Sequence, residues 1–219
     1  SFLTSGQIIN FPDNNLKTRL LQSSPDYPIA ATGWDGTGPT SVIAIDSNND
    51  GEIEQSEALA VTFLNISGSG ISNLSGMEYF TNLHWFSFGN NQVTSATNLL
   101  GLINMEKFGC FGNQLTEINV STYSMLINLT CSNNQLTSLP TLPSGLEELL
   151  VPNTSLTNLP TLPHTLTTLV IDPSKVTCLP NQVEGLQVYM SPSDNTYQEI
   201  PTPPTCGSPC TPPTAPVAT

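Results

Sequence analysis

Basic residues are scarce in this sequence: 4 Lys and Arg stand against 17 Asp and Glu, giving a formal net charge of −13. Proteins that bind nucleic acid use Lys and Arg to replace the counterions of the phosphate backbone, so this composition argues against nucleic acid as a partner. The same deficit argues against docking on anionic lipid. Long apolar runs are also missing. The best of them, residues 58–64, is far shorter than the roughly 20 residues that a membrane span needs.

The sequence also lacks the motifs of the common enzyme classes. The two histidines, His84 and His164, lie several repeats apart and cannot share a metal or a catalytic triad. No G-x-S-x-G, H-E-x-x-H or phosphate-binding glycine-rich loop occurs. We therefore expect a protein that is not an enzyme.

What the sequence does contain is an internal repeat. The pattern L-x-x-L-x-L-x-x-N-x-L recurs at steps of 20 to 22 residues. Its seven starts are Val61, Leu83, Met105, Leu126, Leu146, Leu166 and, in a degraded form, Leu186. This pattern resembles the leucine-rich-repeat family. The resemblance implies an α/β repeat fold, a right-handed solenoid whose short parallel strands line a concave face. Proline-containing segments at 139–143 and 159–163 predict extended, Pro-rich loops on the convex side.

Each position of the repeat has a predicted environment. The fourth position should point inward and form a continuous ridge; it holds Leu64, Phe86, Phe108, Leu129, Leu149, Leu169 and Tyr189. At the ninth position, Asn91, Asn113 and Asn134 should form a buried ladder that binds the backbone of neighbouring turns. Cys110 and Cys131 occupy the inward sixth position on adjacent turns. We expect buried free thiols there, because stacked parallel-strand positions give poor geometry for a disulfide.

Segments outside the repeats are predicted to cap or extend the solenoid. Residues 1–60 form the expected N-terminal cap, 61–200 the repeats, and 201–219 a Pro/Thr-rich linker. Within the cap, residues 8–24 predict a helix with Asp13 as N-cap and one apolar face made of Leu16, Leu20 and Leu21. Residues 25–41 form a turn-rich insertion. A linker needs something to link, so we expect the natural chain to continue beyond Thr219.

Three more cysteines, Cys178, Cys206 and Cys210, lie near the C-terminal end. One disulfide among them is expected in an oxidising compartment. A Cys178–Cys206 bridge would pin the tail to the last turns, whereas Cys206–Cys210 would close a local loop. The first pairing is slightly favoured, and the connectivity stays open at this point.

Residues 46–57, DSNNDGEIEQSE, fit the twelve-residue calcium-loop pattern at every diagnostic position. The segment resembles EF-hand and dockerin-type loops. The resemblance implies oxygen ligands from Asp46, Asn48 and Asp50, a backbone carbonyl from Glu52, a direct or water-mediated contact from Glu54, and bidentate closure by Glu57. The alternative is a solvated acidic turn. Because the motif occurs once, it favours a structural Ca²⁺ site of extracellular affinity over a paired cytosolic sensor.

The segment from Ile9 to Leu83 resembles the N-terminal cap of secreted leucine-rich-repeat proteins of flavobacteria and their relatives. That resemblance implies a bacterial protein that is secreted or displayed on the cell surface. It also implies a C-terminal sorting or anchoring domain beyond residue 219, as many members of the group carry.

Two patches stand out among the strand positions predicted to line the concave face. The candidate ligand-binding residues are Phe63, His84, Trp85, Glu106, Lys107 and the nearby Phe111. The second patch is an apolar ridge of Leu150, Val170 and Met190. Exposed aromatic rings among hydrogen-bonding groups are typical of protein-binding and sugar-stacking surfaces. The alternatives are that the cap or the rings themselves cover the first patch, and that the tail covers the ridge.

These observations favour a non-catalytic recognition module that binds a protein or a glycan through its concave face. One alternative is a structural subunit or spacer in a larger surface assembly. Another is an accessory domain of a secreted enzyme whose catalytic part lies outside this sequence.

Overall fold

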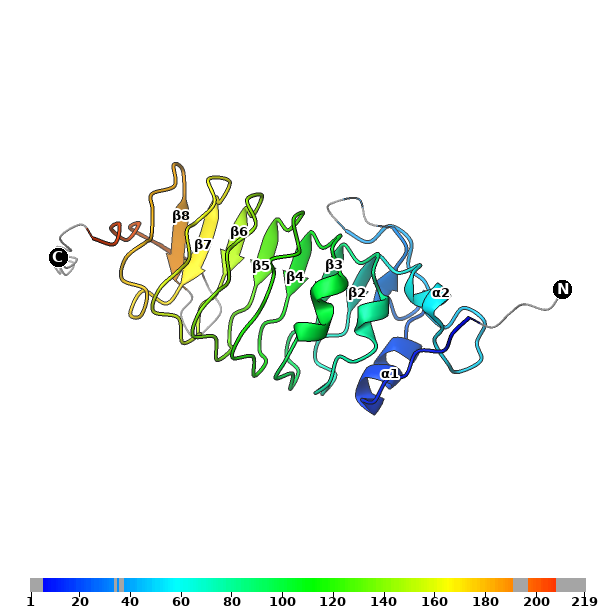
Figure 1. Ribbon diagram of the computed structural model, residues 1–219. Helices are drawn as coiled ribbons and strands as arrows, with labels where there is room; N and C mark the ends of the chain where they lie inside the picture. The colour runs from blue at the N-terminus through cyan, green and yellow to red at the C-terminus, as the bar shows by residue number, and fades with distance from the viewer. Residues whose placement is uncertain (1–5, 34, 36–37, 191–196, 208–219) are drawn as a thin grey trace.

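In the computed structural model, which describes residues 6–33, 35, 38–190 and 197–207, nine short strands form one sheet in the order of the sequence (Figure 1). They are β1 (Ala30–Ala31), β2 (Phe63–Asn65), β3 (Trp85–Ser87), β4 (Lys107–Gly109), β5 (Asn128–Thr130), β6 (Glu148–Leu150), β7 (Thr168–Ile171), β8 (Gln187–Met190) and β9 (Gln198–Ile200). Strands β2 to β8 pair in parallel, each with the next. Each parallel step is one turn of a solenoid, as the repeat predicts.

Strands β2 to β6 have three residues each, and the central side chain of each points inward. Residues at this position lie directly opposite one another on successive strands, as Leu64 does with Phe86 and Phe86 with Phe108. The row continues through Leu129, Leu149 and Leu169, and every member is buried. Alternate residues of a strand point to opposite faces, so the flanking positions lie on the concave face. Stacking thus buries one continuous core that no single repeat could form alone.

A sharp turn follows the parallel strands. The same repeat position adopts a positive φ at Gly68, Asn90, Gly112, Asn133 and Asn153. Glycine and asparagine are the residues that tolerate this backbone conformation best, which explains why these two types alternate there.

The next residue along the chain forms the predicted asparagine ladder, and the structure confirms it. Asn91 donates through Nδ2 to the carbonyl oxygens of Ile66 and Phe88 at 3.0 and 2.8 Å. Its Oδ1 accepts from the backbone N–H groups of Ser69 and Ile71 at 3.0 Å each. Asn113 and Asn134 repeat this arrangement one and two turns later. Each side chain therefore satisfies the backbone of two adjacent turns.

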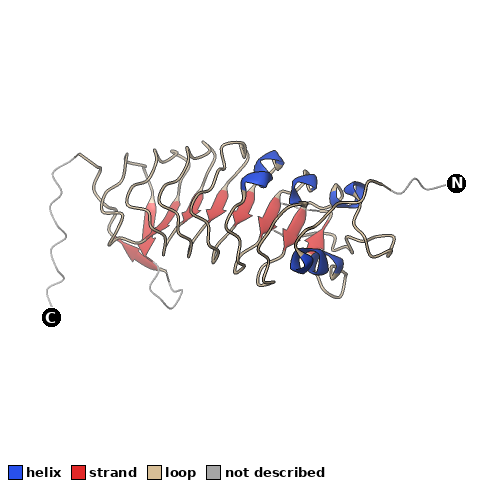
Figure 2. Cartoon of the chain, turned by 60° about the horizontal axis from the view of Figure 1, so that its bottom comes forward, coloured by secondary structure: helices blue, strands red, loops and turns tan. Residues whose placement is uncertain are grey.

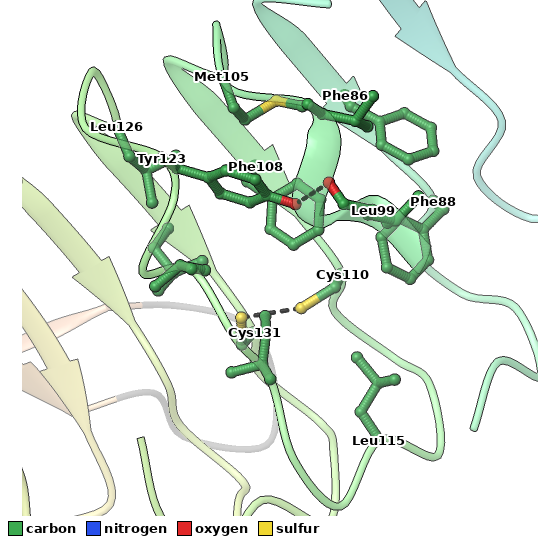
Figure 3. Close-up of a cluster of buried hydrophobic side chains, with 14 of the residues drawn as sticks. Phe86, Phe88, Leu99, Met105, Phe108, Cys110, Leu115, Tyr123, Leu126 and Cys131 are labelled. Carbon is green, nitrogen blue, oxygen red and sulfur yellow. Dashed lines mark hydrogen bonds between the residues drawn. The ribbon is translucent and has the colours of Figure 1, made fainter. Parts of the chain in front are cut away.

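An aromatic cluster fills the core under β3 and β4, and Figure 3 shows its members. The rings of Phe86, Phe88, Phe108 and Tyr123 contact one another in tilted and edge-to-face geometries. The Tyr123 hydroxyl donates to the carbonyl oxygen of Leu99 at 2.8 Å, and burial raises the pKa of this tyrosine well above its usual value. Beneath them, the Sγ atoms of Cys110 and Cys131 lie 2.8 Å apart as buried free thiols, as expected.

The N-terminal cap contains a helix with the predicted N-cap, Asp13, but it is shorter than the predicted 8–24. The helix, α1, spans Asn14–Leu21, and the preceding residues are extended, with the N–H of Ile9 donating to the carbonyl oxygen of Ile53. Leu16 and Leu20 are fully buried, and Leu21 packs partly against the core. A one-turn helix, α2 (Gln55–Ala58), follows the acidic loop. Two 3₁₀ turns, η1 (Met77–Tyr79) and η2 (Thr97–Gly101), occupy the side opposite the strands in the early repeats (Figure 2). The later, proline-containing repeats have extended segments there instead.

Both edges of the parallel sheet are closed by an antiparallel strand that the sequence analysis missed. Within the segment expected to be only a turn-rich insertion, β1 pairs with β2, placing Ala30 opposite Leu64. At the other end, β9 pairs with β8. An uncovered edge strand is a template for pairing with other chains, and these two short strands cover both edges.

The predicted register of the seventh repeat is wrong by one residue. Val188, and not Tyr189, lies opposite Leu169 and is buried. Tyr189 lies opposite Val170 on the concave face, where its hydroxyl donates to Oε1 of Gln187 at 3.1 Å. The observed register is favourable because it buries the apolar side chain of Val188 and lets the Tyr189 hydroxyl keep its hydrogen bond. Ser191 and Asp194, the residues at the sixth and ninth positions of this repeat by the sequence pattern, lie outside the described residues.

Candidate binding surface and acidic loop

Two aromatic rings form the centre of the candidate surface on the concave face. Phe63 on β2 lies opposite Trp85 on β3, and the rings stack with centroids 4.3 Å apart and planes 15° from parallel. Both side chains are half-buried, so each ring keeps an accessible part. Lys107 continues the same row on β4, opposite Trp85. The register of the parallel strands thus places an aromatic pair and a cation side by side.

A polar pair borders these rings. His84 and Glu106 immediately precede β3 and β4, and Nδ1 of His84 lies 2.8 Å from Oε1 of Glu106. Their side chains are 31% and 22% exposed, so both remain accessible to a partner. The main chain holds them in register, because the N–H of Glu106 donates to the carbonyl oxygen of His84 at 2.8 Å.

Phe111, the sixth predicted ligand-binding residue, has a different setting. Its ring lies over Gly89, where an added Cβ would come within 2.3 Å of the phenyl carbons. Both residues belong to the turns that follow β3 and β4, beyond the row that contains Trp85. The structure therefore brings together five of the six predicted residues. Phe111 lies apart from them, in the turn that follows β4. Its predicted proximity came from sequence distance alone.

The predicted apolar ridge of Leu150, Val170 and Met190 is wrong at its third residue, where the structure has Tyr189 in place of Met190. The row across β6, β7 and β8 is Leu150, Val170 and Tyr189, because the seventh repeat is shifted. Val170 is buried and only 1% exposed. The row lies in a hollow of about 380 Å³ lined by Glu148, Leu150, Thr168, Val170, Tyr189 and Tyr197. The repeat pattern does not reveal Tyr197, which lies just before β9 and past the recognisable repeats.

The acidic loop at 46–57 is organised by its own side chains. Oδ1 of Asp46 accepts from the N–H of Asp50 at 3.1 Å, and its Oδ2 accepts from the N–H of Gly51 at 2.9 Å. Asn49 and Gly51 both have a positive φ, which produces the sharp turn. Nδ2 of Asn48 lies 3.2 Å from Oδ2 of Asp50 and 3.3 Å from Oε2 of Glu54. Four of the six predicted ligand residues thus lie around one short loop.

Glu54 carries a carboxylate oxygen that the hydrogen bonds of this loop leave unsatisfied. Its side chain is buried, and Oε1 has no hydrogen-bond partner. Its contact with the Glu57 carboxylate, its burial and the charge of Asp50 raise the pKa of Glu54. An unpartnered oxygen between other carboxylates is the environment in which a hard cation is stabilised.

The carboxylates of two predicted ligand residues, Glu57 and Glu52, already accept hydrogen bonds or pair with a cation within the protein. Oε1 of Glu57 accepts from the N–H and the hydroxyl of Ser47, and Oε2 accepts from the N–H of Glu54. Burial alone would raise the pKa of Glu57, but these hydrogen bonds outweigh it and lower the pKa. The Glu52 carboxylate pairs with Nζ of Lys17 at 2.6 Å, which leaves only its main-chain carbonyl for the predicted role. Bidentate closure by Glu57 would require the Ser47 hydroxyl to move away.

The charged side chains alone do not make a complete site. Across the described part of the chain, no three side chains of His, Cys, Asp or Glu gather as a group able to hold a metal ion. A calcium ion in this loop would therefore depend on the Asn48 oxygen, main-chain carbonyls and water for much of its shell, as six to eight oxygen ligands require.

Comparison with solved structures identifies the architecture. The functional domain of InlJ from Listeria monocytogenes, which includes a cysteine ladder, aligns with a TM-score of 0.52 and 20% identity, covering 88% of this chain and 46% of that one. The fold is a leucine-rich-repeat solenoid. A leucine-rich-repeat protein of Leptospira interrogans aligns at TM-score 0.47 and 23% identity, covering 54% of this chain and 35% of that one. An internalin, InlF, of Listeria monocytogenes aligns at 0.46 and 18%, covering 89% and 56%.

These likenesses concern the leucine-rich-repeat fold only, and the chain spans between about a third and somewhat over half of those proteins. No sequence family model matches the chain, and no curated protein matches it by sequence. Among the residues described, no helix combines the length and apolar character needed to cross a bilayer.

At the C-terminal end of the leucine-rich-repeat array, a disulfide joins Cys178 to Cys206. This is the pairing that the sequence favoured over Cys206–Cys210, and Cys210 itself lies outside the described residues. Main-chain hydrogen bonds accompany the bridge: the N–H of Leu179 donates to the carbonyl oxygen of Pro204, and the N–H of Cys206 donates back to that of Leu179. Residues 204–206, at the start of the expected linker, are thus fixed to the last turns.

Proposed function

We propose that this leucine-rich-repeat solenoid is a non-catalytic recognition module that binds a protein partner through the N-terminal half of its concave face. The observation that carries the proposal is the stacked pair of Phe63 and Trp85, half-buried on the concave face beside Lys107. Large aromatic side chains surrounded by hydrogen-bonding groups make up most binding hot spots. The His84–Glu106 pair supplies such groups at the border of the rings.

We also propose that the protein works outside the cytoplasm, secreted or on a bacterial cell surface. The Cys178–Cys206 disulfide supports this setting, because such bridges persist in oxidising compartments and are rare where glutathione keeps thiols reduced. The net charge of −13 supports a protein ligand over nucleic acid or anionic lipid.

The test of recognition compares the protein and two variants on arrays of extracellular proteins and of glycans. Trp85→Ala removes one ring of the stacked pair. The matched control, Ile103→Ala, removes an apolar side chain that is 56% exposed and lies outside the strands. We expect at least one protein target whose affinity falls tenfold or more in Trp85→Ala and is unchanged in Ile103→Ala, as truncation of a hot-spot residue would produce.

Three results would count against this proposal. A protein target that binds Trp85→Ala as tightly as the natural sequence would move the surface elsewhere. Binding to glycans alone, lost in Trp85→Ala, would replace the protein partner with a sugar. Absence of any target on either array would favour the structural spacer.

We propose in addition that the loop at 46–57 binds Ca²⁺ and fastens the N-terminal cap. The support is the buried, unpartnered Oε1 of Glu54 near the Asp50 carboxylate and the Asn48 amide. Two adjacent residues in the second half of the loop contact the rest of the cap: Glu52 pairs with Lys17 of α1, and the carbonyl oxygen of Ile53 accepts from the N–H of Ile9. An ion that stabilised the loop would therefore stabilise α1 as well.

Thermal unfolding with about 2 mM calcium and with excess chelator tests this site. For a Kd of roughly 0.1–1 mM, binding adds about 0.7–1.8 kcal/mol of stability. That corresponds to a rise in Tm of about 1–7 °C for a chain of this size. The rise should vanish in Asp50→Ala and persist in Asp26→Ala, which removes the same charge from an exposed position outside the loop. Superimposed curves with calcium and chelator would leave the loop as a hydrogen-bonded acidic turn.

A further inference from the structure

A second concave-face feature lies at the opposite end of the array from the Phe63–Trp85 pair. It is the hollow of about 380 Å³ over β6, β7 and β8, which run side by side in Figure 1. This volume falls within the range of roughly 300–1,000 Å³ that is typical of small-ligand sites. Val170 forms its buried floor, Leu150 is half-buried, and Tyr197 at the rim is 54% exposed. We call this feature the tyrosine hollow.

Strand register determines which side chains surround the tyrosine hollow. Tyr189 and Glu199 lie directly opposite each other across the antiparallel pair of β8 and β9. Directly opposed residues project to the same face, and so do residues two apart along a strand. Glu199 therefore lies on the concave face together with Tyr189 and Tyr197.

A second carboxylate lies on the other side of the tyrosine hollow. Glu148 on β6 lines it directly, and Nδ2 of Asn128 donates to Oε2 of Glu148, which orients the carboxylate. Glu148 is exposed, as is Glu199 on the far strand. The tyrosine hollow thus contains two phenol rings and one carboxylate above an apolar floor, and a second carboxylate lies on the neighbouring strand.

This combination matches the chemistry of one side chain better than any other. The planar guanidinium of arginine stacks on aromatic rings, pairs with carboxylates through two parallel N–H···O bonds, and sits at the end of an apolar stem. The described lining of the tyrosine hollow contains no Lys or Arg to neutralise Glu148. The charge of the face therefore complements a cationic partner.

Neither residues 201–219 nor a second copy of this chain fits this chemistry. Residues 201–219 contain no Lys, Arg or His, so the tail cannot supply a cation. A second copy carries the same net charge of −13 and only 4 basic side chains. All four already interact within the chain: Lys17 with Glu52, Arg19 with Tyr27, Lys175 with the carbonyl oxygen of Thr154, and Lys107 with a neighbouring group. The complementary occupant is a different protein.

We infer that the tyrosine hollow binds an arginine side chain of a basic peptide segment in a partner protein. The guanidinium stacks on the phenol rings of Tyr189 and Tyr197 and pairs with Glu148, and Glu199 on the neighbouring strand adds negative charge at the rim. The arginine stem and its apolar neighbours cover Leu150 and Val170. This site is separate from the Phe63–Trp85 pair, and the two can succeed or fail independently.

The test uses the full chain and the peptide acetyl-Leu-Arg-Leu-amide, with acetyl-Leu-citrulline-Leu-amide as a neutral probe of nearly the same shape. Binding is followed by NMR titration of the backbone amides. We expect the arginine peptide to shift amides of β6 to β9 and to bind at least about fivefold more tightly than the citrulline peptide. Raising the salt from about 20 to about 300 mM should weaken the arginine peptide selectively, because screening acts on exposed charges.

Single variants then measure how much each residue contributes to the affinity for the arginine peptide. Tyr197→Ala, Glu148→Gln and Glu199→Gln should each weaken binding of the arginine peptide about threefold to fivefold. Glu117→Gln makes the same charge change at an exposed residue outside the strands and should have no effect. Trp85→Ala should also leave this affinity unchanged, which separates the result from the recognition test above.

Several results would overturn the inference. Equal affinity for the arginine and citrulline peptides would show that charge is irrelevant, and lack of binding by either would remove the site. Shifts confined to residues outside β6 to β9 would do the same. If maltohexaose shifts these amides and neither peptide does, the tyrosine hollow is a sugar-stacking surface.

Discussion

At the scale of single residues, Asp13 makes the connection between the first helix and the first turn of the solenoid. Its Oδ1 accepts from the N–H groups of Asn15 and Leu16 at 2.9 and 3.1 Å and caps α1. Its Oδ2 accepts from the N–H and hydroxyl of Ser72 and from the N–H of Asn73, at 2.8 to 3.0 Å. Burial by itself would raise the pKa of Asp13, but the hydrogen bonds from Ser72, Leu16 and Asn73 outweigh it and hold the pKa below the ordinary 3.8.

Asp13→Asn should therefore lower the free energy of unfolding although it changes the shape of the side chain little. An amide has one acceptor oxygen, so either the cap of α1 or the contact with Ser72 and Asn73 is lost; we expect a cost of about 1–3 kcal/mol at pH 7. Because the folded pKa is depressed, the contribution of the carboxylate is fully present above the unfolded pKa. It is lost as pH falls through the folded pKa. Urea unfolding at pH 7 and near pH 3 should show the difference between the two proteins shrinking at the lower pH.

Asp26→Asn is the matched control for this measurement, since Asp26 is exposed. It should change stability by less than about 0.5 kcal/mol at either pH. A cost for Asp13→Asn that stays the same at pH 7 and pH 3 would show that the charge of Asp13 has no part in its role.

At the scale of elements, the asparagine ladder holds neighbouring turns together. Asn113 donates to the carbonyl oxygens of Phe88 and Cys110 at 3.0 Å, and its Oδ1 accepts from the N–H of Val93 at 3.0 Å. Asn113→Ala would leave these buried backbone groups unpaired at a cost of about 2–4 kcal/mol. Asn158→Ala, in an exposed convex loop, should cost less than about 0.5 kcal/mol, and denaturant titration distinguishes the two. Equal costs would remove the ladder as a source of stability.

The ladder and the inward ridges could be predicted because they recur, and a pattern that recurs is visible without any knowledge of contacts. The edge strands could not. β1 has two residues and β9 has three. Both pair antiparallel to the neighbouring repeat strand and lie outside the repeat itself, so neither leaves a periodic signal in the sequence. Periodicity also explains the wrong position predicted for Tyr189. The sixth repeat is one residue shorter in the structure, whereas the sequence pattern continues with an unchanged step of 20 residues.

The candidate sites divide along the same line. Phe63 and Trp85 could be placed together because repeat positions translate directly into neighbours on parallel strands. The tyrosine hollow could not be foreseen, since it depends on the corrected place of Tyr189 and on Tyr197 beyond the repeats. In the acidic loop, the sequence specifies which residues carry oxygen ligands. It does not reveal that the N–H and hydroxyl of Ser47 already donate to Oε1 of Glu57.

At the scale of the whole molecule, the two ends of the solenoid are stabilised by different means. The N-terminal half has α1, the acidic loop and the aromatic cluster around Phe86 and Phe108. The C-terminal half has smaller aliphatic core residues and the Cys178–Cys206 disulfide. Because the sheet order is sequential, each turn contacts mainly its neighbours, and the free energy of the array is close to a sum of local and nearest-neighbour contributions.

Such an array should lose stability locally when one end is weakened. Replacing both Cys178 and Cys206 with Ser opens a loop of 28 residues, which costs about 3–4 kcal/mol in the chain-entropy description. We expect hydrogen exchange to accelerate strongly in β7, β8 and β9, whose last turns the disulfide fixes, while β2 to β4 keep their protection. Unfolding in denaturant should broaden, because the two ends no longer unfold together. Uniform acceleration from β2 to β9 would instead mean that the solenoid unfolds as one unit, with the disulfide stabilising the N-terminal cap as much as the tail.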